Sequence, residues 1–368
     1  MNSLLTDNSN RASWPGAVEL PPEAKLTFLS HSANYPDKPY RVDTVETHMA
    51  WVFLTDRHAY KMKKPVRYDL LDFRSASARR HFCEEEVRLN RRLAPSVYLG
   101  VVELTLDRRG HLVLGGDGPA VDWLVKMRRL PEASMLDYRL QHASAGAAEM
   151  HAIAVRLAAF YRSLPPQRID GLVYRTRIAL HLIACQRELT VAGAPLPAER
   201  VNRLCHHLRL LLQHLAPLFD LRAAEGKIVE GHGDLRPEHI CLDSDISIID
   251  CLEFSRALRT VDRADELAFL ALEIERGGAP QLATMLLRAY RLLSGDRPRA
   301  ALTQFYQCYR ALVRATLALR HLHEERYRYS PQWAAKACAY LRLAECHARM
   351  PHPSASINLR KSSHRPID

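Results

Sequence analysis

The chain has 368 residues, of which 47% are hydrophobic and 25% are charged. This composition excludes an intrinsically disordered chain, and the length fits one large domain or two lobes. The sequence has no run of about 18 apolar residues, so we expect no membrane span. The first residues lack a charged region followed by an apolar core, so we expect a cytoplasmic protein rather than a secreted one.

The formal net charge is +11, and most of the basic residues are arginine. We interpret this excess mainly as surface charge, because the arginines are scattered along amphipathic helical patterns. Two alternatives remain open: attraction of a polyanion such as a nucleotide, and contact with nucleic acid, which ranks last. The eight cysteines form no CxxC pair and no zinc-finger spacing, so we expect reduced, buried thiols.

The N-terminal part has the pattern of a small, strand-rich lobe. Residues 1–24 look like a loose arm, and residues 42–66 alternate like a β-hairpin with a polar turn at DRH. A helix is expected next, capped by Ser75 or Ser77 and ended by Pro95. Further strands are expected at residues 98–105, 111–115 and 121–130.

The pattern changes after Leu130 and Pro131, where helical periodicity takes over. We therefore expect an N-lobe at 25–130, a helical C-lobe at 131–350 and a flexible tail at 351–368. Helices are expected at residues 147–164, 177–189, 199–219, 262–276, 279–294, 298–325 and 332–349.

One stretch, residues 232–254, interrupts the helices with HGDLRPEHICLDSDISIIDCLEF. Asp234 precedes a loop broken by proline, and Asp250 follows the second strand of an expected hairpin. With His239, these residues should meet at one edge of a cleft. Carboxylates among apolar residues need a cation, a metal or hydrogen bonds. Phosphoryl transfer needs one carboxylate for the attacking hydroxyl and another, with a ligand five residues after the first, for Mg²⁺.

This stretch resembles the HGDLHxxNI…IDFE signature of the aminoglycoside phosphotransferase-like family. The segments VETHMAWVFL, AYKMKKPV, HFCEEEVRLNRRLAP, VKMRRLP and DELAFLALE resemble a bacterial subgroup of uncharacterised phosphotransferase-family enzymes. The resemblance covers roughly residues 25–325. It implies an α+β, bilobal protein-kinase-like fold, with a small β-rich N-lobe and a larger, mostly helical C-lobe.

The resemblance also implies roles for individual residues. Asp234 is the expected catalytic base or hydroxyl-orienting carboxylate, and Asp250 is the expected Mg²⁺ ligand. Lys61 should contact the α- and β-phosphates of ATP, with Lys63 as its rival because alternation puts both on one strand face. Glu86 matches the helix glutamate that pairs with the lysine.

Several further residues have roles that the resemblance leaves less defined. Lys126 and Met127, in a segment expected to link the lobes, would face adenine. His239 stands where the family has a metal-ligating Asn, and imidazole suits Mg²⁺ less than a carbonyl oxygen does. Mn²⁺, a single-metal site and a hydrogen-bonding role for His239 all stay open. Asp265 or Glu266 are candidates to brace the catalytic loop.

The resulting expectation is transfer of the γ-phosphoryl group of ATP to a hydroxyl of a small molecule. The arginine-rich C-lobe favours a neutral or anionic acceptor, and Arg310 and Arg314 are candidates to bind it. The alternative is a nucleotide-binding pseudokinase or regulatory module without transfer activity, which the His239 substitution favours. Members of the subgroup are often fused to a P-loop kinase, but no GxxxxGK[ST] occurs here, so we expect no fused P-loop domain.

Overall fold

The computed structural model describes residues 20–68, 71–191, 193–322 and 330–349. The chain divides into two compact units. The first, here called the sheet unit, is Met1–Ser134 with Asp243–Arg256, and the second, the helical unit, is Met135–Leu242 with Ala257–Asp368. The sequence analysis placed residues 243–256 in the helical lobe. The expected tail and most of the expected arm lie outside the described residues.

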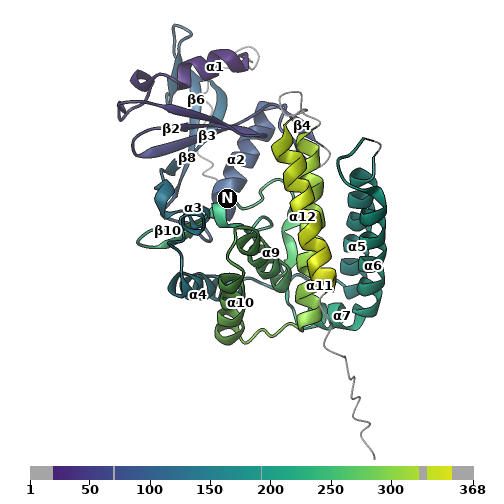
Figure 1. Ribbon diagram of the computed structural model, residues 1–368. Helices are drawn as coiled ribbons and strands as arrows, with labels where there is room; N and C mark the ends of the chain where they lie inside the picture. Colours follow the sequence, from purple (N-terminus) through teal and green to yellow (C-terminus); the bar gives the residue numbers. More distant parts are fainter. Residues whose placement is uncertain (1–19, 69–70, 192, 323–329, 350–368) are drawn as a thin grey trace, which may run out of the picture. The chain divides into compact units, whose positions relative to one another are not determined.

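The sheet unit is built on a six-stranded antiparallel sheet with the strand order β1-β2-β3-β8-β6-β7 (Figure 1). Its strands are β1 (Asp43–Glu46), β2 (Ala50–Leu54), β3 (His58–Lys63), β6 (Tyr98–Leu106), β7 (Leu112–Leu114) and β8 (Ala120–Arg128). A separate short pair is formed by β4 (Arg67–Tyr68) and β5 (Leu71–Asp72).

The hairpin expected at residues 42–66, with its turn at DRH, is confirmed by the antiparallel pair β2 and β3. Its first strand, however, is divided into two strands, β1 and β2. The reason is a side-chain turn at Thr47, whose hydroxyl donates to the carbonyl of Ala50 at 2.9 Å and accepts from its N–H at 3.0 Å. Thr55 closes the next turn in the same way with His58. Threonine hydroxyls are known to replace backbone partners in tight turns.

Alternation along β3 gives the sheet two different faces. Tyr60 and Met62 pack on the face covered by α1 (Pro22–Leu29), which begins inside the expected arm 1–24. Ala59 packs on the other face, against α2 (Ala76–Asn90). Period-2 geometry therefore places Lys61 and Lys63 on the α2 face. Helix α2 begins at Ser75, whose hydroxyl accepts from the N–H of Ala78 at 3.2 Å.

The helical unit surrounds one large apolar core. The expected helix at 199–219 breaks at Leu215, because Pro217 starts a new helix and has no N–H to continue the old one. The longer helices are α3 (Leu136–Gln141), α4 (Ala147–Ser163), α5 (Gly171–Leu189), α6 (Ala198–His214), α7 (Ala216–Ala224), α9 (Arg263–Arg276), α10 (Pro280–Ser294), α11 (Ala300–His321) and α12 (Pro331–Arg349).

The remaining elements are short. Antiparallel β9 (Ile228–Glu230) and β12 (Thr260–Asp262) pair within the helical unit. The others are β10 (Ile240–Leu242), β11 (Ile246–Ile248), α8 (Arg256–Arg259) and 3₁₀ turns at Ser32–Asn34, Glu132–Ser134 and Pro237–His239. An antiparallel sheet in the N-terminal part and helices in the C-terminal part confirm the α+β prediction. None of the described helices has the length and apolar composition of a membrane span.

Candidate active site

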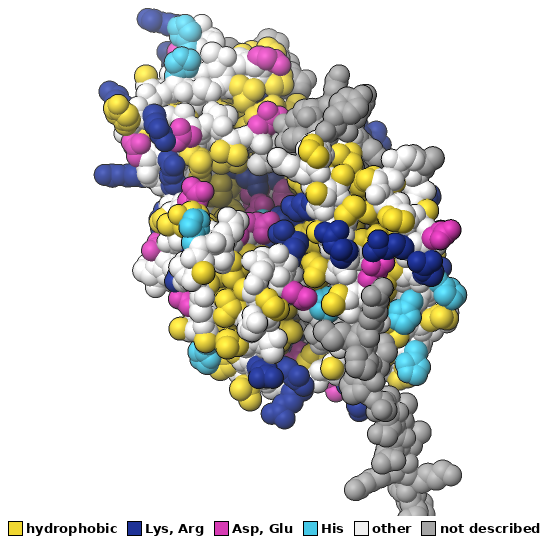
Figure 2. All heavy atoms as spheres, in the orientation of Figure 1, with side chains coloured by type: hydrophobic (Ala, Val, Ile, Leu, Met, Phe, Trp, Pro, Cys, Tyr) yellow, Lys and Arg dark blue, Asp and Glu magenta, His cyan; other side chains and the backbone are white. Residues whose placement is uncertain are grey.

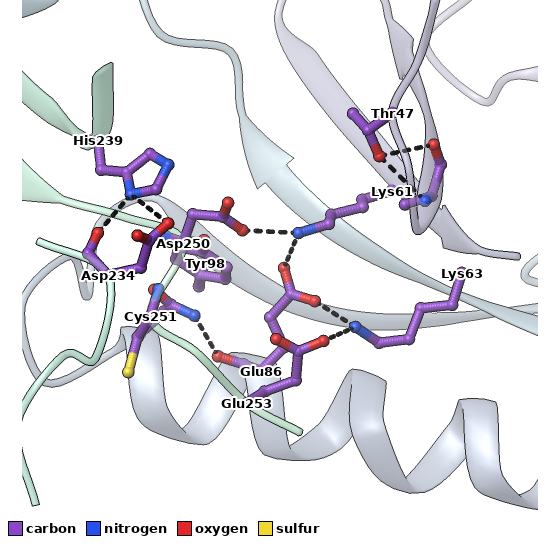
Figure 3. Close-up of polar contacts among 12 residues, drawn as sticks. Thr47, Lys61, Lys63, Glu86, Tyr98, Asp234, His239, Asp250, Cys251 and Glu253 are labelled. Carbon is purple, nitrogen blue, oxygen red and sulfur yellow. Dashed lines mark hydrogen bonds and ion pairs between the residues drawn. The ribbon is translucent and has the colours of Figure 1, made fainter. Parts of the chain in front are cut away.

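Two lysines and three carboxylates form a connected network in the sheet unit (Figure 3). The Lys61 ammonium lies 2.9 Å from Glu86 and 2.7 Å from Asp250. The Lys63 ammonium lies 2.7 Å from the second oxygen of Glu86 and also donates to Glu253. Four expected site residues thus lie together: Lys61 and Lys63 from β3, Glu86 from α2, and Asp250 from the segment after β11. Glu253, from the same segment, also contacts them.

The two lysines differ in exposure although both bind Glu86. The side chain of Lys61 is 17% exposed, whereas that of Lys63 is 2% exposed. Burial opposes the charge of Lys61, but Asp250 and Glu86 raise its pKa well above the usual value. Burial likewise opposes the charge of Glu86, but Lys61 and Lys63 lower its pKa. Lys61 and Glu86 are therefore both charged at neutral pH, and Lys61 is the lysine with access to solvent.

Asp250 is held in a strained backbone conformation. Its φ is +60°, in the left-handed region that residues other than glycine seldom adopt. Its N–H donates to the Tyr98 hydroxyl at 3.1 Å, and the next N–H, of Cys251, donates to the Asn90 side chain at 2.8 Å. Asn90 in turn donates to the carbonyl of Glu86. Helix α2 and strand β6 therefore fix where the Asp250 carboxylate points.

Sequence reasoning missed Asn90 and Tyr98 as supports of this segment. The spacing of Glu86 and Asn90, one helical turn apart, was visible in EEEVRLN. Nothing in the sequence indicated Tyr98, since its partner lies 152 residues away.

The loop that carries Asp234, in the helical unit, is held by a buried carboxylate from α9. The backbone N–H groups of His232 and Gly233 both donate to Glu266, the first at 2.8 Å. Tyr161 donates to the same carboxylate at 2.8 Å. The N–H of Asp234 then donates to the His232 ring at 3.3 Å. Of the two candidates to brace this loop, Glu266 is the one in contact with it.

Arg236 is a neighbour of Asp234 that sequence reasoning did not single out. Its Nε donates to Asp234 at 3.0 Å, and its Nη1 donates to Glu238. Burial opposes ionisation of Asp234, but Arg236 and, more weakly, Arg314 lower its pKa. Asp234 is therefore a carboxylate at neutral pH, which can orient a hydroxyl or accept its proton.

Both ring nitrogens of His239 have partners in this loop. Arg236 Nη2 lies 3.2 Å from Nε2, and because a guanidinium has only donors, Nε2 must accept. Nδ1 therefore carries the proton and donates to the carbonyl of Asp234 at 2.8 Å. His239 thus has the hydrogen-bonding role that the sequence left open, and a metal at Nε2 would have to displace Arg236.

The structure also gives the positions of Arg310, Lys126 and Met127, for which the sequence predicted roles in the site. Arg310 forms a bidentate ion pair with Asp265, at 2.7 and 2.6 Å, so its guanidinium is already occupied. Lys126 and Met127 lie near the end of β8, in agreement with the expected strand at 121–130, and Met127 packs into the core on the α2 face. Their place in a segment that links the lobes stays a prediction. Their contact with adenine stays a prediction.

The Asp250 carboxylate is suited to be one ligand of a magnesium ion. Mg²⁺ in nucleotide enzymes binds one or two carboxylates together with phosphate oxygens and water. The Asp250 side chain, 44% exposed and anchored through its backbone, fits that requirement. No three His, Cys, Asp or Glu side chains in the described ranges gather into a metal-binding group of their own.

The chain is similar to proteins whose function is not known and to solved kinases. No family profile matches it. It is 33% identical over 319 residues to uncharacterised proteins of Mycobacterium bovis and Mycobacterium tuberculosis, which covers 84% of this chain and 60% of theirs. The chain therefore spans about 60% of the length of these curated relatives.

Among solved structures, choline kinase from Cryptosporidium parvum has a TM-score of 0.51 at 10% identity, covering 88% of this chain and 94% of that chain. An aminoglycoside phosphotransferase from Streptomyces rimosus has a TM-score of 0.46 at 19% identity, covering 79% of this chain and 97% of that chain. The first likeness shows the fold. The chain therefore has a kinase-like fold, as the sequence resemblance implied, and its curated relatives are uncharacterised mycobacterial proteins.

Proposed function

We propose that the protein is an ATP-dependent phosphotransferase that moves the γ-phosphoryl group to a hydroxyl of a small molecule. The observation that carries this proposal is the position of Lys61 between Glu86 and Asp250. A kinase needs such a lysine for the nucleotide phosphates, a glutamate to hold it and an aspartate for the metal. The kinase-like fold supports the same assignment.

In this proposal Lys61 contacts the α- and β-phosphates, and Lys63 is a positioning residue. Lys61 has the more exposed ammonium, whereas Lys63 is enclosed between Glu86 and Glu253. Asp250 would hold Mg²⁺, or Mn²⁺, on the phosphates. When bound, the metal supplies positive charge that stabilises the transferring group.

Asp234 is the proposed group for the acceptor hydroxyl. Its lowered pKa keeps it ionised, and the loop bonds to Glu266 hold its backbone in place. His239 would fix this geometry by its hydrogen bond to the Asp234 carbonyl instead of binding metal. Positioning of the hydroxyl is expected to contribute more than proton transfer, as in other phosphoryl transfers.

The second candidate is a nucleotide-binding pseudokinase or regulatory module. It is favoured by His239, whose two nitrogens are both engaged, so that the usual second metal ligand is missing from the loop. This candidate predicts that ATP binds but is not turned over.

Metal-dependent ATP turnover, measured with a panel of hydroxyl compounds, separates the two candidates. In wild type we expect transfer with at least one acceptor. Asp234→Asn should lower kcat about 100-fold or more with little change in nucleotide affinity, because it removes the acid–base group and keeps the volume. Asp245→Asn, an exposed aspartate on the turn after β10, is the matched control and should behave as wild type. Equal turnover in Asp234→Asn and wild type would contradict the assignment.

A further inference from the structure

Three cations from three helices gather around one buried carboxylate in the helical unit. Arg276, at the end of α9, donates from Nε to Glu273 at 2.8 Å, and Arg314, on α11, places its Nε 3.4 Å from the other oxygen. The Tyr340 hydroxyl of α12 also donates to Glu273, at 2.7 Å. Both guanidinium groups lie over the Tyr340 ring, at 5.4 and 5.7 Å from its centre. Lys336 lies one turn before Tyr340 on α12.

These cations have donors that the described part of the chain does not use. Arg276 and Arg314 are both anchored through Nε, and their Nη groups form no hydrogen bond with the described residues. Lys336 has no carboxylate within ion-pair distance there and only faces the Trp333 ring at 5.1 Å. Glu273 is the one carboxylate that the cluster shares, so two positive charges are in excess.

Other half-buried or buried arginines of this unit are used differently. Arg310 donates from both Nε and Nη2 to Asp265, and Arg222 spreads its three nitrogens over Asp262 and Asp296. Arg310 and Arg222 thus each bind a carboxylate through at least one Nη group, whereas Arg276 and Arg314 bind theirs through Nε alone. Burial lowers the pKa of Lys336, and the positive charges of Arg314 and Arg276 lower it further.

The cluster lies beside the loop that carries Asp234, because α9, which holds Glu273 and Arg276, packs against the 3₁₀ turn Pro237–His239 of that loop. Arg314 helps to lower the pKa of Asp234 and of Glu238. Glu238 in turn helps to raise the pKa of Arg276 and opposes the lowering of the pKa of Lys336. Such influence requires charges that are close together in a partly buried environment. Figure 2 shows Lys and Arg side chains in a row across the face of the helical unit at the level of α12.

We propose that Arg276, Arg314 and Lys336 form a subsite for a compact anionic group, a phosphate or a carboxylate, on the acceptor molecule. This inference rests on the proposed function, because it assigns the acceptor to the side of Asp234. Two guanidinium forks and one ammonium match the oxygens of such a group and would satisfy the open Nη donors. The acceptor is then a hydroxyl compound with an anionic group, not a cationic amine alcohol.

The test measures binding of orthophosphate and, separately, of acetate to the full chain by calorimetry. The protein is first saturated with the non-transferable analogue AMP-PNP and Mg²⁺, so that the nucleotide-phosphate site is occupied. Wild type is compared with Lys336→Gln, which removes a half-buried charge without breaking an ion pair, and with Arg314→Lys. The matched control is Arg320→Gln, also on α11, whose guanidinium binds Glu188 at the surface.

We expect at least one of the two anions to bind wild type, and the better one to show whether the group is phosphate-like or carboxylate-like. Lys336→Gln and Arg314→Lys should each weaken that binding about tenfold, and Arg320→Gln less than about twofold. Equal affinity in all four proteins, or no anion binding while AMP-PNP binds, would overturn the subsite and leave the proposed function standing. Failure of AMP-PNP to bind would contradict the proposed function, and the anion titration without nucleotide would then still decide the subsite.

Discussion

Glu86 is the residue on which the lysine network depends, because each of its oxygens binds a different lysine. Its side chain is fully buried, as is nearly all of Lys63. Its neighbours Glu84 and Glu85 instead pair with arginines at the surface of α2. The three consecutive glutamates therefore have different roles, which helix geometry assigns by turning each one about 100° from the next.

Glu86→Ala should lower the free energy of unfolding by about 3–5 kcal/mol, because it leaves buried lysine charge without its partner. Glu84→Ala should change it by less than about 0.5 kcal/mol, since its pair with Arg80 is exposed. Urea unfolding of both variants and wild type measures the difference. A loss below 1 kcal/mol in Glu86→Ala would mean that the lysines are hydrated in solution.

Sequence reasoning reached the identity of these residues but not all of their contacts. Period-2 alternation was enough to put Lys61 and Lys63 on one face, and both do contact Glu86. It did not predict that Lys63 would bind Glu253. That contact joins residues 190 apart, and no local pattern reports such a distance.

At the scale of elements, α5 and α11 pack through a histidine that burial keeps neutral. The His181 ring lies 2.6 Å from the Tyr309 hydroxyl. Burial lowers the pKa of His181 to about 4, and Arg310 and Arg320 add to the shift while Glu188 opposes it. In the unfolded chain the same imidazole titrates near 6.5. Protonation therefore favours unfolding, and the stability that His181 contributes above about pH 6.5 is lost as the pH falls towards 4.

Between pH 7 and pH 5, wild type should lose about 2 kcal/mol more unfolding free energy than His181→Gln, which keeps a polar group beside Tyr309. The exposed His206 on α6 serves as the control, and His206→Gln should follow wild type. Urea titrations at the two pH values give the comparison. If His181→Gln shows the same acid loss as wild type, the imidazole is solvated in the folded state.

The boundaries of elements were predicted well where the hydrophobic periodicity extended over many residues. They were predicted poorly where a single side chain determines the end of the element. Helices such as α4 and α12 agree closely with their expected ranges. Strand β8, observed at Ala120–Arg128, likewise agrees closely with the expected range of 121–130. The turn at Thr47 and the break before Pro217 depend on one hydroxyl and one missing N–H.

At the scale of the whole molecule, the net charge is +11, yet many arginines form local ion pairs with carboxylates. Many arginine side chains therefore pair with carboxylates of the same unit. This pairing favours the interpretation of the basic residues as structural and surface charge. The cytoplasmic location and the low rank of nucleic acid as a partner stay predictions, as does the absence of a fused P-loop domain. The relatives, of which this chain spans about 60%, leave room for further activities in the longer proteins.

The central claim is that Lys61 and Asp250 form the nucleotide and metal site, and thermal stability tests it most directly. ATP with Mg²⁺ or Mn²⁺, at about one hundred times its Kd, should stabilise wild type by about 2.7 kcal/mol and raise its Tm. The rise should require metal and disappear in Lys61→Ala and Asp250→Ala. It should persist in Lys64→Ala, whose lysine on the same segment binds Glu46 instead. No metal-dependent rise in wild type, or an equal rise in Asp250→Ala, would contradict the account.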